Sequence, residues 1–327
     1  MNIWYSLLLT VLLLLAALFG VQYPFVFGVI IPYAAVAIFV LGIVYRVVKW
    51  ARSPVPFRWP TTAGQQKSLP WIKANNLESP YNTWGVLGRM ILEILLFRSL
   101  FRNTKVELRD GSRLIYISEK FLWLGSLTFH WCLLIILLRH FRFFTEPVIG
   151  FVYWLQSIDG LLEITIPTLY LTDVFIVIAL LYLFARRLYN PQVRYISLFT
   201  DYFALFLLMG VVFSGIWMRY LDKVDIIKVK ELAIGLVMFS PTVPEGIGSI
   251  FYIHLFLVSV LLIYFPFSKL LHMAGVFFSP TRNLANTNRM KRHINPWNPK
   301  VKVHTYKEYE EEFGDLMKSA GLPLDKE

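Results

Sequence analysis

The sequence predicts an all-α integral membrane protein, a bundle of six transmembrane helices with a cytoplasmic loop and tail. Of its 327 residues, 57% are hydrophobic and 16% are charged, a balance that is not that of an ordinary soluble domain. A helix needs about 20 apolar residues to cross a bilayer core of about 30 Å. Six apolar segments fit this requirement, near residues 3–20, 24–45, 121–141, 166–185, 200–218 and 247–271.

The first two spans form an N-terminal part, residues 1–48. The segment Asn2 to Leu18 lacks the basic residues that precede the apolar core of a signal peptide. We therefore expect the first span to be retained as a transmembrane helix and not to be cleaved.

Lysine and arginine residues set the orientation. Segments 46–120, 186–194 and 269–327 hold 13, 3 and 10 of the 32 basic residues, whereas six lie on the other side of the spans. Because basic loops remain in the cytoplasm, we expect both termini to be cytoplasmic and the protein to lie in the cell membrane. This basic rim explains the net charge of +11 without nucleic acid. It also suits anionic lipid headgroups or an acidic partner.

Residues 49–120 are expected to form a long cytoplasmic loop. Its stretch 84–101 is nearly apolar enough to span the membrane, but Arg89, Glu93 and Arg98 interrupt it. A seventh span would also place the basic tail outside. We therefore predict a helix in the cytoplasmic interface, which serves either as an anchor or as a docking site for a partner.

The C-terminal tail, residues 276–327, is expected to be cytoplasmic. It is polar at first and becomes acidic and helix-prone over residues 306–321. His293 and His304 stand alone in this solvated segment, so we predict that they are surface residues and not metal ligands.

Four other histidines lie inside apolar spans, where an imidazole is costly unless it is paired or binds a metal. The third span carries His130 and His140, and the sixth carries His254 and His272. Eighteen residues are five helical turns, so the sixth-span pair is expected on one face, about 27 Å apart. The third-span pair differs by about 80° around the axis. Two shared sites would therefore need tilted or bent helices, and Pro266 is placed to supply a bend.

The predicted topology assigns a depth to each histidine. The third span runs outward and the sixth runs inward, so His130 meets His272 near the cytoplasmic face and His140 meets His254 near the outer face. Two imidazoles per site are the axial ligand count of a haem, which predicts a dihaem four-helix domain over residues 121–275. The alternative is that neighbouring side chains or water satisfy the histidines, which then serve in packing or in a proton relay.

The chain has a single cysteine, Cys132. One cysteine can hold neither an iron–sulfur cluster nor a covalently attached c-type haem. We therefore expect two haem b groups, and we expect Cys132 to be a packing residue.

A quinone site beside the outer haem would need polar groups for the ring oxygens and for protons. Six residues near that face are candidates: Arg139, Arg142, Glu146, Asp159, Glu163 and Lys223. Each has a structural alternative, since arginines reach lipid headgroups, acids are solvated in loops and a lysine can end a span. Glu146 is the preferred proton-exchanging group because it is the acid nearest to His140.

The histidine spacing resembles that of a known family. Nine residues separate His130 from His140 and 17 separate His254 from His272, and YFPFSKLLH ends at His272. These features resemble the gamma subunit of respiratory nitrate reductase, in which the matching histidines are the axial ligands of two haems. The present chain departs from that family in its additional first span, longer loop and long tail.

Further phrases resemble more closely the DsrM family, the membrane cytochromes of the sulfite-reduction-associated Dsr complex. They are KWARSPVPFR, GQQKSLPWIK, FRSLFRNT, RHFRFFTEPV and RYISLFTDYF. This resemblance implies menaquinone exchange in the membrane, a cytoplasmic iron–sulfur partner like DsrK, and other Dsr subunits. It also implies that electrons end on, or come from, a disulfide or trisulfide carried by the small protein DsrC.

We therefore predict a dihaem cytochrome b subunit that takes electrons from menaquinol and passes them to a cytoplasmic iron–sulfur subunit in dissimilatory sulfur metabolism. One alternative is the membrane cytochrome b of a heterodisulfide reductase or of a quinone-interacting membrane oxidoreductase. Another is a transporter with histidine relays, against which the lack of paired broken helices and inverted repeats counts. A scaffold role would leave the four histidines unexplained.

Overall fold

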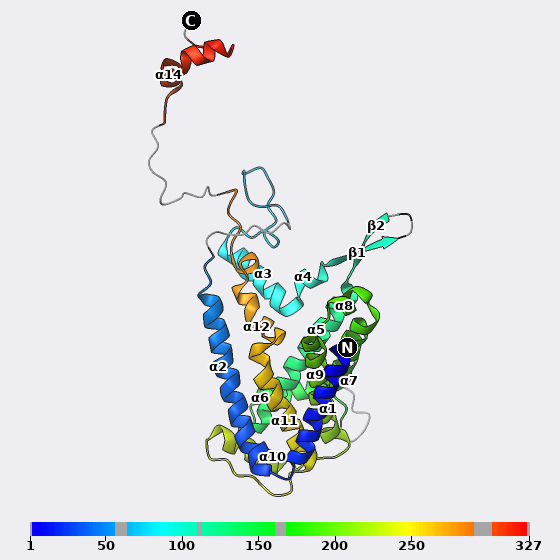
Figure 1. Cartoon of the computed structure of the whole chain (residues 1–327). Helices are drawn as coiled ribbons and strands as arrows, with labels where there is room; N and C mark the ends of the chain where they lie inside the picture. Colours follow the sequence, from blue (N-terminus) through cyan, green and yellow to red (C-terminus); the bar gives the residue numbers. More distant parts are fainter. Residues whose placement is uncertain are drawn as a thin grey trace.

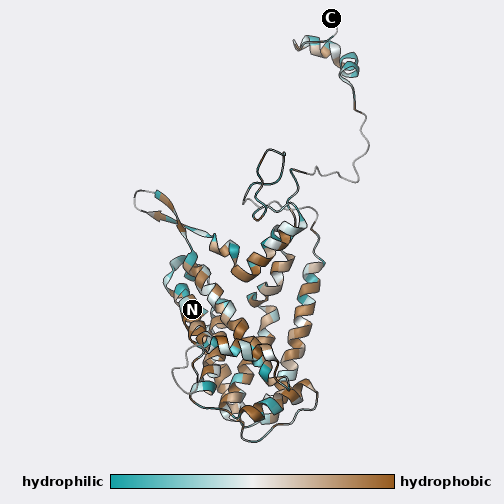
Figure 2. Ribbon diagram, turned by 180° about the vertical axis from the view of Figure 1, so that it is seen from behind, coloured by the Kyte–Doolittle hydropathy of each residue, from teal (hydrophilic) through white to brown (hydrophobic). Residues whose placement is uncertain are grey.

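The computed structural model describes residues 2–55, 64–109, 111, 113–160, 168–290 and 303–325. The described chain is mostly helical, and its long helices form an apolar bundle with more polar segments at its ends (Figures 1 and 2). Five of these helices are long and apolar enough to cross a membrane. They are α1 (Asn2–Gly20), α2 with the π-helical turn before it (Val26–Ala51), α5 with the turn after it (Lys120–Phe143), α9 (Phe199–Tyr220), and α11 with the turn after it (Ser249–Phe267).

The fourth expected span corresponds to α7 (Leu171–Tyr189), which packs between α5 and α9. Its buried residue Ile176 contacts the core formed with Phe129 of α5 and Leu208 of α9. Its 19 residues include three charged side chains, Asp173, Arg186 and Arg187, and it is not among the five helices that are apolar enough to cross a membrane. A six-span topology thus stays a prediction, in which α7 joins the five apolar helices as the fourth span along the chain.

The two N-terminal helices pack against the rest of the bundle. Helix α1 lies against α9 and α11, and α2 lies against α11. The hydroxyl of Ser6 donates to the carbonyl of Phe199 over 2.8 Å, which ties the start of α1 to the start of α9. Gly42 of α2 allows close contact with α11, because a Cβ there would lie 2.7 Å from Cγ of Pro266.

The stretch predicted to form one interfacial helix forms two helices, α3 (Thr83–Leu96) and α4 (Arg98–Phe101). Asn82 caps α3 by accepting a hydrogen bond from the backbone N–H of Gly85 over 2.8 Å. The break comes at Phe97, whose φ of 49° lies in the left-handed region that ends helices. Two indole N–H groups of α5 donate to the carbonyls at the end of α3, from Trp131 to Leu95 and from Trp123 to Leu96.

The segment between α2 and α5 also contains a β-hairpin that the all-α prediction missed. Strand β1 (Thr104–Arg109) pairs antiparallel with β2 (Arg113–Ser118), with Val106 opposite Tyr116. The sequence signal was the alternation of polar and apolar residues in β1 and the β-branched and aromatic residues of β2, with Gly111 at a φ of 81° in the turn. At the opposite end of the bundle lies α10 (Ile226–Val237), and α6 (Gly150–Asp159) follows α5 (Figure 1).

The expectation of one continuous sixth helix was wrong. Helix α11 proper runs from Ser249 to Tyr264, and two 3₁₀ turns follow it, Phe265–Phe267 and Lys269–Leu271. Pro266 has no N–H to continue the helical hydrogen bonds, and Ser268 is extended with a ψ of 177°. His272 therefore begins a separate short helix, α12 (His272–Gly275), and does not share a helix face with His254.

The chain then continues through a short helix, α13 (Pro280–Asn283), which contacts α3. The acidic helix predicted in the tail is α14 (Tyr306–Ser319). Thr305 and Glu308 form a capping box at its start, in which each side chain accepts from the other residue's backbone N–H. A further short helix, α8 (Pro191–Ile196), follows α7.

Candidate functional site

His130 and His272 lie side by side although they come from distant elements. His130 projects from the middle of α5, and His272 begins α12 after the break in the chain at Pro266. Their ring centroids are 5.8 Å apart and their planes are nearly perpendicular, at 84°. With metal–nitrogen bonds of about 2 Å, two imidazoles on opposite sides of one metal have centroids roughly 6 Å apart. We call these two residues the inner couple.

His140 and His254 form the second couple, which we call the outer couple. His140 ends α5, and His254 lies in the second turn of α11. His140 is close enough to His254 to act on it electrostatically. Because α5 and α11 pass in opposite directions, the two couples lie at opposite ends of the bundle.

Hydrogen bonds orient three of the imidazoles in the same way. The Nδ1 atoms of His130 and His140 lie 2.7 Å from the carbonyl oxygens of Ser126 and Ile136, one turn earlier in α5. The Nδ1 of His272 lies 2.9 Å from the carbonyl oxygen of Lys269. A carbonyl only accepts, so Nδ1 donates in each case and the lone pair of Nε2 is left to bind a metal.

The fourth imidazole is held by a side chain. Ser214 Oγ lies 2.9 Å from Nδ1 of His254 and 2.7 Å from the carbonyl oxygen of Gly210. The carbonyl takes the hydroxyl hydrogen, so the hydroxyl oxygen accepts from Nδ1 of His254 and again leaves Nε2 free. A Cβ at Gly215 would lie 3.3 Å from Cε1 of His254, which shows how closely α9 approaches this ring.

The small residues of α9 have a role besides helix packing. Gly210 and Ser214 have the spacing of small residues that is typical of a close helix contact, and a Cβ at Gly210 would lie 3.4 Å from Leu257 of α11. The bond from His254 to Ser214 was not predicted. Sequence spacing alone does not give the rotation of α9 relative to α11.

Aromatic rings enclose the inner couple. Phe97 contacts His130 edge-to-face at 4.9 Å between centroids, and Phe129 does so at 5.1 Å. Phe97 is the left-handed residue between α3 and α4, so the segment between α2 and α5 contacts the inner couple directly. His272 itself is exposed, whereas His130 is half-buried.

Arg139, beside the outer couple, belongs to a buried ionic network. It pairs with Asp159 and lies 3.8 Å from Asp173. Arg139 and Arg219 stack on the ring of Tyr170, at 3.8 and 3.7 Å from its centroid. Asp159 is only 5% exposed, so the structural alternative of an acid solvated in a loop does not apply to it: it ends α6 and accepts from the backbone and hydroxyl of Thr172.

The remaining quinone candidates lie in different surroundings. Arg142 donates to Gln156 over 3.1 Å, and Glu146 pairs with Lys230. Lys223 is exposed in the loop between α9 and α10. Glu163 lies outside the described residues. The structure therefore does not gather these side chains into one pocket.

The other single residues have structural surroundings. Cys132 is buried in the core between α5, α7 and α9. His304 lies 3.5 Å from Glu312 of α14, and His293 is outside the described residues. In the part of the chain that is described, no three or more histidine, cysteine or acidic side chains gather around a common point, so the histidines stand in twos.

The chain is similar in sequence to known proteins. The family model of the nitrate reductase gamma subunit matches residues 81–292. The Hdr-like menaquinol oxidoreductase cytochrome b-like subunit of Archaeoglobus fulgidus is 49% identical over 281 residues, 84% of each chain. The protein of the same name from Archaeoglobus profundus is 42% identical over 276 residues, 82% of each chain. His130, His140, His254 and His272 lie inside the matched region, and the chain belongs to the nitrate reductase gamma subunit family.

Proposed function

We propose that this protein is the dihaem cytochrome b subunit of a membrane redox complex, which takes electrons from menaquinol and passes them to a cytoplasmic iron–sulfur subunit. The observation that carries the proposal is the gathering of four histidines into two couples at opposite ends of the bundle. The relatives are named as cytochrome b-like subunits of a menaquinol oxidoreductase, which supports both the quinone and the multisubunit assembly.

The donor sets fit two haem b groups. Each couple offers two neutral imidazoles with Nε2 free, which is the number of ligands that haem iron takes from a protein in a six-coordinate site. A bound haem supplies a one-electron acceptor in apolar surroundings. His130 and His272 would hold the inner haem and His140 and His254 the outer haem. The hydrogen bonds to Nδ1 keep each ring in one tautomer and one orientation.

The proposed topology has six spans, with α7 as the fourth, in the cell membrane. The chain segments that follow α2, α7 and α11 leave the same end of the bundle (Figure 1). Those segments carry 26 of the 32 basic residues. The positive-inside rule therefore places this end, and with it both termini, in the cytoplasm.

We propose an iron–sulfur protein like DsrK as the cytoplasmic partner, within a Dsr-type complex of sulfur metabolism. The inner couple faces the cytoplasmic segments, and His272 is exposed there. A membrane cytochrome b of a heterodisulfide reductase is the second candidate, which the words "Hdr-like" in the relatives' names favour. Identification of the subunit that co-purifies with the native chain separates the two assignments.

Menaquinol oxidation is assigned to the outer couple. Protons released at that end leave on the outer side while electrons move toward the partner. Arg139, Arg142, Glu146 and Lys223 remain the quinone contacts that sequence position proposes, although three of them already hold a protein partner.

A haem count tests this function. The dithionite-reduced minus oxidised spectrum of the purified chain, quantified as the pyridine haemochrome, should give two haems b per chain. A chain that contains no haem when expressed with sufficient haem supply would refute the cytochrome assignment and leave the histidine-relay reading.

A further inference from the structure

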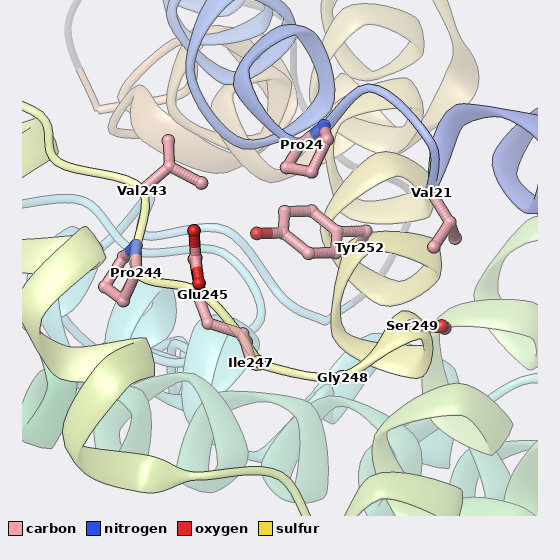
Figure 3. Close-up of a pocket in the computed structure, with 10 residues that line it drawn as sticks. Val21, Pro24, Val243, Pro244, Glu245, Ile247, Gly248, Ser249 and Tyr252 are labelled. Carbon is pink, nitrogen blue, oxygen red and sulfur yellow. The ribbon is translucent and has the colours of Figure 1, made fainter.

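An open pocket of about 390 Å³ lies at the end of the bundle where α11 begins, the end that holds the outer couple. Three segments line it: the link between α1 and α2, the loop between α10 and α11, and the first turn of α11 (Figure 3). Val21 and Pro24 come from the first of these segments, which lies outside the region that the family model matches. The N-terminal helix pair thus builds a pocket that the matched region alone does not contain.

The chemistry of the pocket is apolar with two functional groups. Most of its side chains are aliphatic or proline: Val21, Pro24, Val243, Pro244 and Ile247. The hydroxyl of Tyr252 and the carboxylate of Glu245 are turned toward one another across the opening (Figure 3). Among the residues that the structure describes, neither group has a hydrogen-bond or ion-pair partner. An apolar site of this size with a few placed polar groups is typical of a small-molecule site.

Tyr252 is fixed in position. The residue is only 5% exposed, and its ring packs with Val29, Leu232 and Ile247. Gly28 gives the ring space, because a Cβ there would lie 3.2 Å from Cε1 of Tyr252. The ring is therefore held by the core while its hydroxyl faces the pocket.

Glu245 is exposed and sits on a loop whose shape depends on glycine. Gly246 has a φ of 74° and Gly248 a φ of 107°, which other residues adopt at a cost. This geometry brings the carboxylate back over the start of α11. Because the carboxylate is in contact with water, a proton that Glu245 accepts can leave to the outer face.

We infer that this pocket binds the ring of the quinol, with Tyr252 and Glu245 at its hydroxyl groups. The inference rests on the proposed function, and it names the substrate site of that function. Oxidation of one quinol gives one quinone, two electrons and two protons. The electrons go to two ferric haems, one each, while Glu245 takes one proton and water at the mouth takes the other.

The position relative to the outer couple suits this role. Two residues turn an α-helix by about 200°, so Tyr252 and His254 point to opposite sides of α11. The pocket therefore lies behind the helix that carries His254, about one helix diameter of 10–12 Å away. The sequence-based candidates Arg139 and Glu146 are engaged in ion pairs, whereas Glu245 is not.

Photolabelling tests the site without relying on catalysis. The purified full chain is illuminated with 2-azido-1,4-naphthoquinone, and labelled peptides are mapped by mass spectrometry. Label on residues 243–252 or 21–24 that excess menadione removes is the expected result. Glu245→Gln and Tyr252→Phe should each reduce this label at least fivefold, whereas the matched changes Glu231→Gln and Tyr153→Phe should leave it unchanged.

Reduction by menadiol in a stopped-flow instrument gives the second readout. With haem content and spectra verified, Glu245→Gln should slow haem reduction at least tenfold, since a general base contributes about 100-fold or more. Tyr252→Phe should mainly raise the menadiol concentration for half-maximal rate, about fivefold, as expected for one lost hydrogen bond. Glu231, which accepts a hydrogen bond from Thr242 at the same end, provides the control for charge.

The outcomes separate the two proposals. If the wild-type haems accept electrons from menadiol but label and rates are unaffected by Glu245→Gln and Tyr252→Phe, the pocket inference is wrong and the proposed function stands. If only Glu146→Gln and Arg142→Ala slow haem reduction, the quinol binds at these sequence-based candidates and not in the pocket. A wild-type chain without haem refutes the proposed function, and the label map then decides the pocket by itself.

Discussion

The two histidine couples are built by different means. The outer couple lies within packed helices, where α9 approaches α11 so closely that Ser214 holds the ring of His254. The inner couple is not built from two packed helices. Its second member, His272, follows the break in the helix at Pro266. Phe97, from the break between α3 and α4, contacts the ring of His130, the other member of this couple.

This difference indicates that the two ends of the bundle differ in how easily their structure rearranges. Packed helices with hydrogen-bonded side chains change little, because interiors are dense and their rotamers are fixed. An end assembled from short turns and a loop opens at a lower free-energy cost. The outer end is thus suited to a fixed substrate site, and the inner end to the docking of the proposed partner subunit.

The largest expected effect comes from removing single histidines. His140→Ala and His254→Ala should each halve the haem content and leave the same residual spectrum. His130→Ala and His272→Ala should also halve it but leave the other spectrum, because one axial ligand does not hold a six-coordinate haem firmly. Haemochrome counts and low-temperature spectra measure both. Loss of the same haem in the His130 and His140 variants would show that the histidines are paired wrongly.

The assignment of inner and outer ends rests on the topology. Alkaline phosphatase fused after Glu327 should be inactive and green fluorescent protein at the same point fluorescent. Alkaline phosphatase inserted between Asp222 and Lys223, in the exposed loop after α9, should be active. The reverse pattern at either position would exchange the two ends.

A smaller effect should follow from Ser214→Ala, which removes the side-chain partner of His254 only. The outer haem should still be incorporated, yet transfer to apomyoglobin about tenfold faster, since losing a second partner of a ligand typically weakens metal binding by that factor or more. The inner haem should transfer at the wild-type rate. Ser259→Ala is the matched control, because Ser259 is equally buried in α11 and bonds only to its own helix. Equal acceleration in both variants would indicate a general loosening of the bundle.

The smallest expected effect is a pH dependence of the stability of the loop at the inner end. Glu78 binds Arg98 of α4 and Arg102, and so anchors the loop that carries Phe97. Although burial itself raises the pKa of Glu78, the hydrogen bond and charge of Arg98 and the charge of Arg102 hold that pKa below its ordinary value of 4.5. A lowered carboxyl pKa stabilises the folded loop above pH 4.5, and this contribution is lost as the pH falls through the folded pKa.

Hydrogen exchange of the α3 and α4 peptides measures this contribution. At neutral pH, Glu78→Gln should exchange about tenfold faster than the wild type, which corresponds to about 1.4 kcal/mol. The difference should shrink below pH 4.5, and peptides at the start of α11 should not respond. A difference that persists unchanged into acid would show that the carboxylate charge is not what holds the loop.

Much of the helical architecture could be predicted from the sequence because apolar length is a strong signal. The break after Tyr264 was less accessible, since one proline in an apolar run bends some helices and ends others. Asp159 illustrates a further limit: its burial depends on Arg139 and Thr172, which lie 20 and 13 residues away in sequence. Tyr252 and Glu245 gave no sequence signal, because their proximity depends on how the N-terminal helices pack against α11.

The haem content of paired and crossed double variants tests the central claim most directly. If each couple holds one haem, the paired variant His130→Ala/His272→Ala should retain one haem b per chain. The crossed variant His130→Ala/His254→Ala should retain none. One haem in the crossed variant, with none in the paired variant, would contradict the claim that His130 shares a haem with His272 and His140 shares one with His254.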